Sequence, residues 1–363
     1  MASHGVARTF RVRTEEQRQQ DLEKIRKYRA LEDEVRARAA SADFTPELFQ
    51  LTSKLLSINP EYYTIWNVRR RCLLSSLLSP LATSQQQPPA ARDAADKKAS
   101  SDLAVLQSEL TFTIPLLVQS PKCYWIWNFR QWALSQAILR LSAAAARQAW
   151  QTELDLTSKM LDKDRRNFHA WSYRRLVIGR LESPELQGES MAEEEFAYTE
   201  RIIRRDLSNF SAWHNRSQLI RRLLEERGAD AGKRAAMLGQ ELDLVREALN
   251  VGPEDQSLWY YHRFLVSQII NRGAGQTFLP PLTAREKVAY LGREIDEIEE
   301  LLEDYDDVKW IYESLLEYTL ALGELEEGCT ERRDLRGWLA KLRALDPMRM
   351  GRWDDVEMQI GCL

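Results

Sequence analysis

Five tryptophans recur along this chain in one short pattern, and this repetition constrains the fold more than any other feature of the sequence. They are Trp66, Trp127, Trp171, Trp213 and Trp259, at intervals of 61, 44, 42 and 46 residues. A pattern repeated at a nearly constant spacing of about 40 to 50 residues is typical of helical-repeat proteins. We therefore expect stacked copies of one structural unit.

The pattern around each tryptophan is aromatic-x-x-Trp-x-x-Arg. Four copies keep it, with Tyr63, Tyr124, Phe168 and Phe210 three positions before the tryptophan and Arg69, Arg130, Arg174 and Arg216 three positions after. The fifth copy has Gln256 before, and its arginine slips to Arg263, four positions after. A degenerate sixth copy near Trp310 keeps only the tryptophan. The first interval is long because it contains residues 80–101, a segment rich in Pro, Gln, Ala and Ser that predicts a flexible insertion.

Each unit is predicted to contain two helices. Before the third tryptophan, the spacing of one helix face links Trp150, Leu154, Thr157 and Leu161. Proline-containing turns such as Ser120-Pro121 follow, and the tryptophan opens the second helix. Strand signals are nearly absent. We expect an all-α chain, an α-solenoid of helical hairpins that forms a single repeat domain over residues 1–363.

A further helix is predicted near the N-terminus. Thr14 and Gln17 are spaced as a capping box at its start. Apolar residues then follow on one side of the helix, at Leu22, Ile25, Tyr28, Leu31 and Val35.

The repeated tryptophans and arginines are expected to be structural, with the indoles in the core and the arginines holding the turn of a neighbouring repeat by forked hydrogen bonds. Function is expected where the copies differ. The position five before each tryptophan is Glu61, Lys122, Arg166, Ser208 and Glu254. Lys122 and Arg166 both open a helix, where free backbone N–H groups favour an anion. They could form a phosphate-sized positive spot, and they could equally be solvated surface charges.

Composition excludes several other classes of protein. The net charge of −4 argues against a nucleic-acid or membrane-surface binder. The four cysteines form no CxxC pair, and the four histidines, including His4, share no metal-ligand spacing with them. No apolar run is long enough for a transmembrane segment, and the N-terminus lacks a signal-peptide core. We expect a cytoplasmic protein with no metal of its own, and no catalytic motif such as HExxH is present.

The repeats resemble those of protein prenyltransferase alpha subunits, and the likeness covers nearly the whole chain. The segments that carry it are "HGV…RTEEQ", "LTSKLLSINPEYYTIWNVRR", "RRNFHAWSYRR", "DQSLWYYHR" and "LRALDPMR". They are most similar to the type II group, the alpha subunits of Rab geranylgeranyltransferase. The resemblance implies a right-handed, crescent-shaped solenoid wrapped around a beta subunit that carries the catalytic zinc and the lipid pocket.

The resemblance also assigns site residues. It places the family's diphosphate-contacting lysine and its companion tyrosine at Lys122 and Tyr124. Lys122 is one of the two residues that the comparison of repeats had already singled out. In the third repeat it places substrate-side residues at Asn167 and His169, with Arg166 beside them. The implied substrates are geranylgeranyl diphosphate and Rab GTPases, which an escort protein presents on the helices of the alpha subunit.

Two alternatives remain open at this stage. The chain could be the alpha subunit shared by farnesyltransferase and the type I enzyme, but the glutamine that follows the site tyrosine in those subunits is Trp125 here. It could also be a non-catalytic helical scaffold, since HEAT-type repeats of about 40–47 residues have a similar period. The chain ends soon after "DPMRMGRWDDVEMQIGCL", which predicts that it lacks the additional C-terminal domains of some type II subunits.

Overall fold

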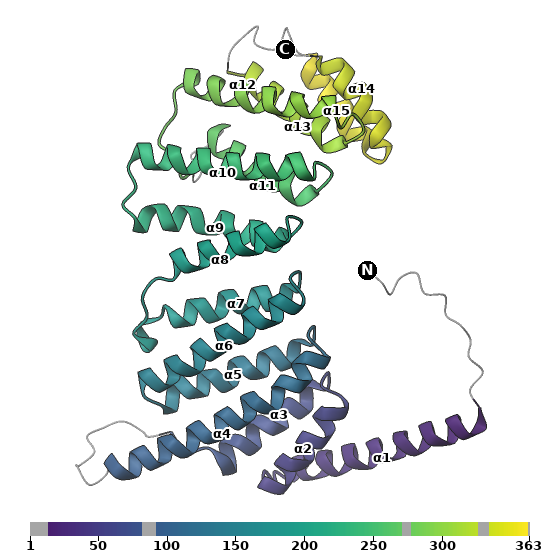
Figure 1. Ribbon diagram of the computed structural model, residues 1–363. Helices are drawn as coiled ribbons and strands as arrows, with labels where there is room; N and C mark the ends of the chain where they lie inside the picture. Colours follow the sequence, from purple (N-terminus) through teal and green to yellow (C-terminus); the bar gives the residue numbers. More distant parts are fainter. Residues whose placement is uncertain (1–13, 82–91, 271–276, 326–333, 362–363) are drawn as a thin grey trace. The chain divides into compact units, whose positions relative to one another are not determined.

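The chain folds into antiparallel helical hairpins that follow one another in sequence order (Figure 1). The computed structural model describes residues 14–81, 92–270, 277–325 and 334–361. Within these ranges there are α-helices and short 3₁₀ or π turns, and no strand. The prediction of an all-α solenoid is confirmed. The helices group into two compact units, Met1–Glu189 and Ser190–Leu363.

The first unit contains a long N-terminal helix and three hairpins. Its helices are α1 (Glu15–Ala40), α2 (Pro46–Ile58), α3 (Tyr63–Cys72), α4 (Arg92–Gln119), α5 (Tyr124–Arg140), α6 (Ala143–Lys163) and α7 (Phe168–Leu181). A π-helical turn, Leu73–Leu77, extends α3, and a 3₁₀ turn, Pro184–Leu186, follows α7. The pairs α2/α3, α4/α5 and α6/α7 are the hairpins of the first three repeats.

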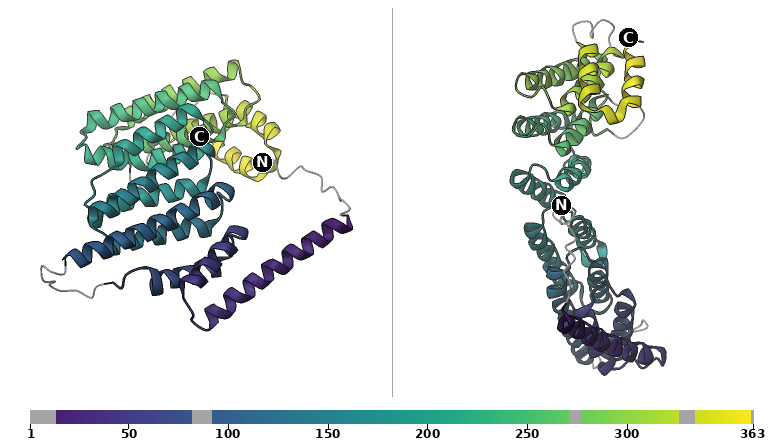
Figure 2. Two further views of the ribbon diagram at one scale, coloured as in Figure 1. Left: turned by 60° about the horizontal axis from the view of Figure 1, so that its bottom comes forward. Right: turned by 90° about the vertical axis from the view of Figure 1, so that its right-hand side faces the viewer.

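The second unit contains four hairpins built in the same way. Its helices are α8 (Ala192–Arg205), α9 (Phe210–Glu226), α10 (Ala231–Val251), α11 (Gln256–Ile270), α12 (Ala284–Glu300), α13 (Lys309–Gly323), α14 (Leu335–Leu345) and α15 (Met350–Ile360). Short 3₁₀ turns, Leu301–Glu303 and Pro347–Arg349, precede α13 and α15. Within each unit, the right-hand view of Figure 2 shows many of these helices nearly end-on.

Part of the predicted flexible insertion, residues 80–101, is helical in the structure. Residues 92–101 form the first turns of α4, so the helix extends well into the segment that we expected to be flexible. Asp102 fixes this part of the helix, because its buried carboxylate accepts the Ser79 backbone N–H at 2.8 Å. Residues 82–91, the remainder of the predicted insertion, lie outside the described residues.

Each repeated tryptophan closes the turn that precedes its helix. The indole N–H donates to the backbone carbonyl six residues earlier, at distances of 2.5–3.0 Å from Nε1 to the oxygen. The acceptors belong to Pro60, Pro121, Arg165, Leu207 and Pro253. All five indoles are buried, as predicted. Each ring therefore fills the core and satisfies one turn carbonyl that the helix ladder leaves unpaired.

The repeated arginines join neighbouring repeats, but through helices and not through a turn. In the second repeat, Arg130 donates a fork to Glu153 of α6, with Nε–Oε1 at 2.8 Å and Nη2–Oε2 at 2.5 Å. Its Nη1 also donates to the Thr113 hydroxyl of α4. Arg69 binds Glu109 and Arg216 binds Glu241 in the same way. For Arg69, Arg130 and Arg216 the predicted forked hydrogen bonds form, but the acceptor is a glutamate on the first helix of the next repeat and not a group of its turn.

The fifth repeat replaces the arginine with His262. The ring of His262 is fully buried, and its Nε2 lies 3.0 Å from Glu294 of α12 while its Nδ1 lies 2.9 Å from the hydroxyl of Tyr318. Glu294 also accepts two hydrogen bonds from Arg246 of α10. The histidine therefore takes the place of the arginine in the network. Arg263, which we expected to fill this role, binds Glu313 and Glu317 instead.

Two further helices differ from the sequence pattern. In the sixth hairpin, Tyr312 occupies the register of the motif tryptophan, since its hydroxyl donates to the Asp306 carbonyl six residues earlier. Trp310 lies two residues before it and contacts the ring of Tyr260. In α1 the predicted capping box forms and Val35 is buried, but Leu22 and Ile25 are largely exposed. The apolar stripe of α1 is therefore covered only toward its C-terminal end.

Candidate functional site

The most distinctive turn of the first unit is Ser120–Tyr124, which joins α4 to α5. Lys122 lies at its tip with 67% of its side chain exposed. Tyr124 is the first residue of α5 and is 57% exposed. No side chain caps the N-terminus of α5, so the first-turn N–H groups add to the positive charge of Lys122. The two strongest sequence candidates thus lie together on the surface at a helix start.

Two buried side chains hold this turn from below. The carbonyl of Pro121, directly before Lys122, accepts the Trp127 indole N–H at 3.0 Å and the Asn167 amide N–H at 3.2 Å. The other end of the same Asn167 amide caps α7, because its oxygen accepts the backbone N–H groups of His169 and Ala170. Asn167 therefore locks the turn of repeat two onto the helix start of repeat three. Its side chain is 0% exposed, with donor and acceptor both engaged inside the chain.

His169 and Tyr124 form the second link between these repeats. Their rings meet edge to face with centroids 4.3 Å apart, and the ring of Phe168 stacks on the same imidazole with the centroids 4.0 Å apart. His169 is only 7% exposed. The structure thus brings Tyr124, Asn167 and His169 together with the turn that carries Lys122.

The surroundings of His169 favour its neutral form. Burial is the main cause that lowers the pKa of His169 from its ordinary value of 6.5, and the positive charge of Lys122 lowers it further. The carboxylate of Glu61 opposes both effects. Burial and Lys122 thus both favour the neutral imidazole of His169, and Lys122 carries the positive charge of the Ser120–Tyr124 turn.

Among the predicted site residues, Arg166 has the weakest case for a role in binding. It is exposed on the turn before α7, and its backbone N–H donates to the Asp164 carboxylate at 3.3 Å. That same carboxylate lies 3.8 Å from the Lys122 ammonium group, across the junction of the two repeats. Sequence reasoning did not single out Asp164, because its distance of 42 residues from Lys122 hides the contact.

Trp125 also acquires a partner that the sequence did not indicate. Its ring packs at a tilt against Tyr63 of the first repeat, with the centroids 5.2 Å apart. Both rings are partly exposed. The position after Tyr124 thus presents a partly exposed aromatic ring that packs against the neighbouring repeat.

No three side chains among the described His, Cys, Asp and Glu residues are grouped closely enough to hold a metal ion. None of the described helices is long and apolar enough to cross a membrane.

Comparisons with known proteins agree with this arrangement. The family model of the protein prenyltransferase alpha subunit repeat matches residues 46–76, 106–137, 150–181, 192–223 and 238–269, which are the five tryptophan-centred repeats. The geranylgeranyl transferase type-2 subunit alpha of Saccharomyces cerevisiae is 32% identical over 355 residues, or 96% of this chain and 97% of that protein. That of Schizosaccharomyces pombe is 32% identical over 371 residues, covering 99% of each chain. That of Rattus norvegicus is 31% identical over 271 residues, covering 73% of this chain but 42% of its own length.

Proposed function

The chain belongs to the protein prenyltransferase alpha subunit family, and from that premise we propose that it is the alpha subunit of a heterodimeric Rab geranylgeranyltransferase. Such an enzyme transfers a geranylgeranyl group from geranylgeranyl diphosphate to C-terminal cysteines of Rab GTPases. Two relatives that carry the type-2 name align with this chain over nearly their whole length, which supports the choice within the family.

The observation that carries the proposal is the exposed cation at the start of α5. Lys122 and Tyr124 offer an ammonium group and a hydroxyl on a turn that Trp127 and Asn167 hold in place. An exposed cation on a turn whose backbone is fixed is suited to stabilise charge that develops on a leaving group.

The proposed reaction gives these residues defined roles. A cysteine sulfur forms a bond to the allylic carbon of the isoprenoid while the bond from that carbon to the diphosphate oxygen breaks, and diphosphate leaves with the electron pair. The beta subunit would hold the lipid and the zinc, and the zinc would favour loss of the thiol proton to solvent, so that the substrate cysteine reacts as its thiolate. In this chain, the Lys122 ammonium group would turn from Asp164 to neutralise charge on the departing diphosphate, and the hydroxyl of Tyr124 would donate a hydrogen bond to it.

The remaining predicted residues take supporting parts in the proposal. Asn167 would hold the turn through the Pro121 carbonyl, and His169 would hold the ring of Tyr124. The sequence had led us to expect both residues to bind substrate. Arg166 would add a second positive charge near the diphosphate. A Rab escort protein would dock on helices of this chain, and the complex would be cytoplasmic.

Specificity for Rab proteins is proposed over the farnesyltransferase and type I alternative. The support is Trp125, whose ring packs against Tyr63 and carries no amide for the C-terminal carboxylate of a CaaX substrate. We expect the assembled enzyme to modify a Rab–escort complex and to leave CaaX peptides unmodified. Efficient transfer to a CaaX peptide would contradict this choice.

The proposal is tested first by isolating the chain with its partner. Affinity purification of the tagged full chain should yield a one-to-one complex with a prenyltransferase beta subunit, identified by mass spectrometry. That complex should transfer radiolabelled geranylgeranyl to a Rab–escort complex. A monomer, or a stoichiometric partner of another class, would leave a helical scaffold as the better description.

A further inference from the structure

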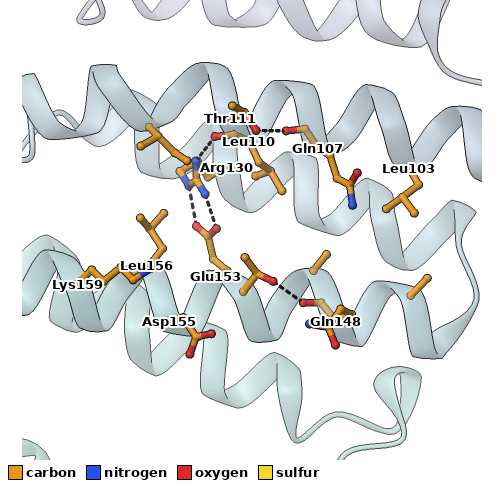
Figure 3. Close-up of a pocket in the computed structure, with 14 residues that line it drawn as sticks. Leu103, Gln107, Leu110, Thr111, Arg130, Gln148, Glu153, Asp155, Leu156 and Lys159 are labelled. Atoms are coloured by element: carbon orange, nitrogen blue, oxygen red, sulfur yellow. Dashed lines mark hydrogen bonds and ion pairs between the residues drawn. The ribbon is translucent and has the colours of Figure 1, made fainter.

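A second feature of the first unit lies away from the Lys122 turn. A cavity of about 670 Å³ opens between α4 and α6, the first helices of repeats two and three (Figure 3). The Arg130–Glu153 fork lines its floor, and no residue of the turns at 120–124 or 164–169 contributes to it. We call this cavity the α4/α6 groove.

The walls of the α4/α6 groove are mainly apolar. On α4 they are formed by Leu103, Leu110 and Ile114, and Ile114 is 40% exposed. On α6 the wall is low, because Ala145 and Ala149 present only methyl groups. Figure 3 shows the two helices side by side with the groove between them.

The floor offers no polar group to a ligand. Arg130 and Glu153 are buried and bind each other through two hydrogen bonds. The remaining arginine nitrogen, Nη1, donates to the Leu110 carbonyl and the Thr113 hydroxyl. An occupant of the α4/α6 groove therefore meets only apolar contacts and engaged polar groups at the floor, while the polar lining residues Gln107, Thr111, Gln148 and Thr152 belong to the walls.

The second unit contains the equivalent groove between α8 and α10, and there a larger side chain occupies the position of Ala149. There the floor is the Arg216–Glu241 fork, and Met237 lies four residues before the floor glutamate, as Ala149 does before Glu153. Met237 is only 6% exposed, so its side chain fills the depth of its groove. The cavity that remains there is about 440 Å³.

The rims of the two grooves also differ in charge. Five positions after the buried glutamate of the first helix, α4 has Ile114 and α8 has Glu200. Glu200 pairs with Arg204 at 2.8 Å, and Glu193 and Arg227 form a second pair at the same rim. The α4/α6 groove has an apolar residue where the α8/α10 groove has an ion pair, so it is both deeper and less polar.

Size and charge restrict what can occupy the α4/α6 groove. Leu103 and Ile114 are eleven residues apart on α4, a length of about 16 Å. With a width of about 10 Å, the diameter of one helix, the groove has a footprint of roughly 160 Å². This area is far smaller than the roughly 800 Å² that each partner buries in a stable protein dimer, so a second copy of this chain is disfavoured. Apart from the floor pair, the charged residues that line the groove are Asp155 and Lys159, one turn apart at the end near Ile114. Within the described part of the chain neither forms an ion pair, and their opposite charges would match a lysine and a glutamate one turn apart on a helix.

We propose that the α4/α6 groove binds an amphipathic helix of a partner protein, which inserts long apolar side chains into the space beside Ala149. The groove is about three helical turns long. A short amphipathic helix can bind in a groove of this length through side chains at positions i, i+4 and i+7. The side chain that fills this depth in the second unit is a methionine, so methionine or leucine fits the vacant position.

The test uses the full-length chain and a defined probe, a fluorescent stapled peptide of 15 residues. The peptide carries Leu or Met at i, i+4, i+7 and i+11, a Lys/Glu pair one turn apart at one end, and Gln or Ser elsewhere. Fluorescence anisotropy should give a Kd on the order of 10–100 µM, as expected for one short isolated helix. A scrambled peptide of the same composition should bind at least about 10-fold more weakly.

Two substitutions copy the second unit into the first and should abolish binding. Ala149→Met fills the groove as Met237 does, and Ile114→Glu places the charge of Glu200 on its wall. Both should fold, since methionine is a good helix former and Ile114 is partly exposed. The matched control is Ala144→Met, which adds the same side chain at an exposed position of α6 outside the groove.

The result that supports the proposal is a loss of at least about 10-fold in affinity for both variants, with unchanged circular dichroism and unchanged binding by the control. Equal binding by Ala149→Met and the native chain would overturn it, and so would failure of the native chain to bind the peptide. A change in sedimentation caused by Ala149→Met in the absence of peptide would point to a second copy as occupant and would also contradict the proposal.

Discussion

Repeats two and five share the same hairpin scaffold and differ at two positions. One position is buried between helices, and the other lies on the exposed turn. Both close their turn with the tryptophan indole, through Trp127 and Trp259. Inside, the arginine of repeat two becomes His262 in repeat five, and the buried glutamate keeps its charge partner because Arg246 reaches Glu294. Outside, Lys122 of repeat two becomes Glu254, a reversal of charge.

The two differences teach different things about the chain. A change in the interior is accompanied by a second change that restores its hydrogen bonds, as a buried charge requires. A change on the exposed turn needs no such repair, because the Lys122 ammonium group is largely exposed and its one described ion pair, with Asp164, lies at the surface. The same contrast separates the two grooves, where Ala149 and Met237 share a register but leave different space.

The largest effect is expected inside repeat two. Arg130→Met should lower the free energy of unfolding by about 3–5 kcal/mol, because it leaves the Glu153 carboxylate buried without a cation. Urea unfolding followed by circular dichroism measures this loss. The double variant Arg130→Met/Glu153→Leu should regain most of it, and a double variant as unstable as the single one would contradict the assignment.

The equivalent change in repeat five should cost less. His262→Leu removes two buried hydrogen bonds but leaves Glu294 paired with Arg246, so a loss of about 1–3 kcal/mol is expected. The same urea experiment compares the two repeats directly. A loss as large as that of Arg130→Met would show that Arg246 does not compensate. Arg246→Met in the His262→Leu background should then bring the total close to the repeat-two value.

The exposed turn should affect activity and leave stability unchanged. In the assembled enzyme Lys122→Ala should lower turnover about 10- to 100-fold, or about 1.4–2.7 kcal/mol in the barrier, since one stabilising cation is lost. The urea midpoint and the yield of the complex should not change. Glu254→Ala, at the same slot of repeat five, is the matched control and should leave turnover unaltered. Equal losses of assembly and turnover would refute the proposed role of Lys122.

The smallest effect concerns pH. Because burial and Lys122 lower the pKa of His169, the unfolded chain binds a proton at a pH where the folded chain does not. The contribution of His169 to stability should therefore fall as the pH drops below about 6.5. Unfolding of the native chain and of His169→Phe between pH 7.5 and 5.0 measures the difference in slope. Lys122→Ala should reduce the slope, and an identical slope in His169→Phe would exclude this histidine as the cause.

Much of the fold could be predicted because the helices follow from the three- and four-residue spacing of apolar side chains along the chain. The steps of four and three that link Trp150, Leu154, Thr157 and Leu161 define a helix face without any partner, and all four side chains are buried. The same argument failed for α1, where Leu22 and Ile25 satisfy the spacing but remain exposed. Spacing shows which side of a helix is apolar, but not whether another helix of the chain covers it.

The candidate site was predicted in part. Comparison of the repeats singled out Lys122 and Arg166 as the only cations in their slot, and the resemblance added Tyr124, Asn167 and His169. Asp164 was missed, since its contact with Lys122 spans two repeats. Asn167 was expected to bind substrate, but its side chain is buried. Its amide caps α7 and donates to the Pro121 carbonyl.

By itself the sequence determined the repeated hairpin, the order of the copies and the family, because each depends on residues that are close together in the chain. The tertiary structure decided which glutamate each arginine binds, which turn carries an exposed cation, and how deep the groove beside Ala149 is. These properties join residues 20 to 50 positions apart. Only the stacking of one hairpin on the next fixes such distances, since hydrogen bonds and cavities depend on what each neighbour leaves unfilled.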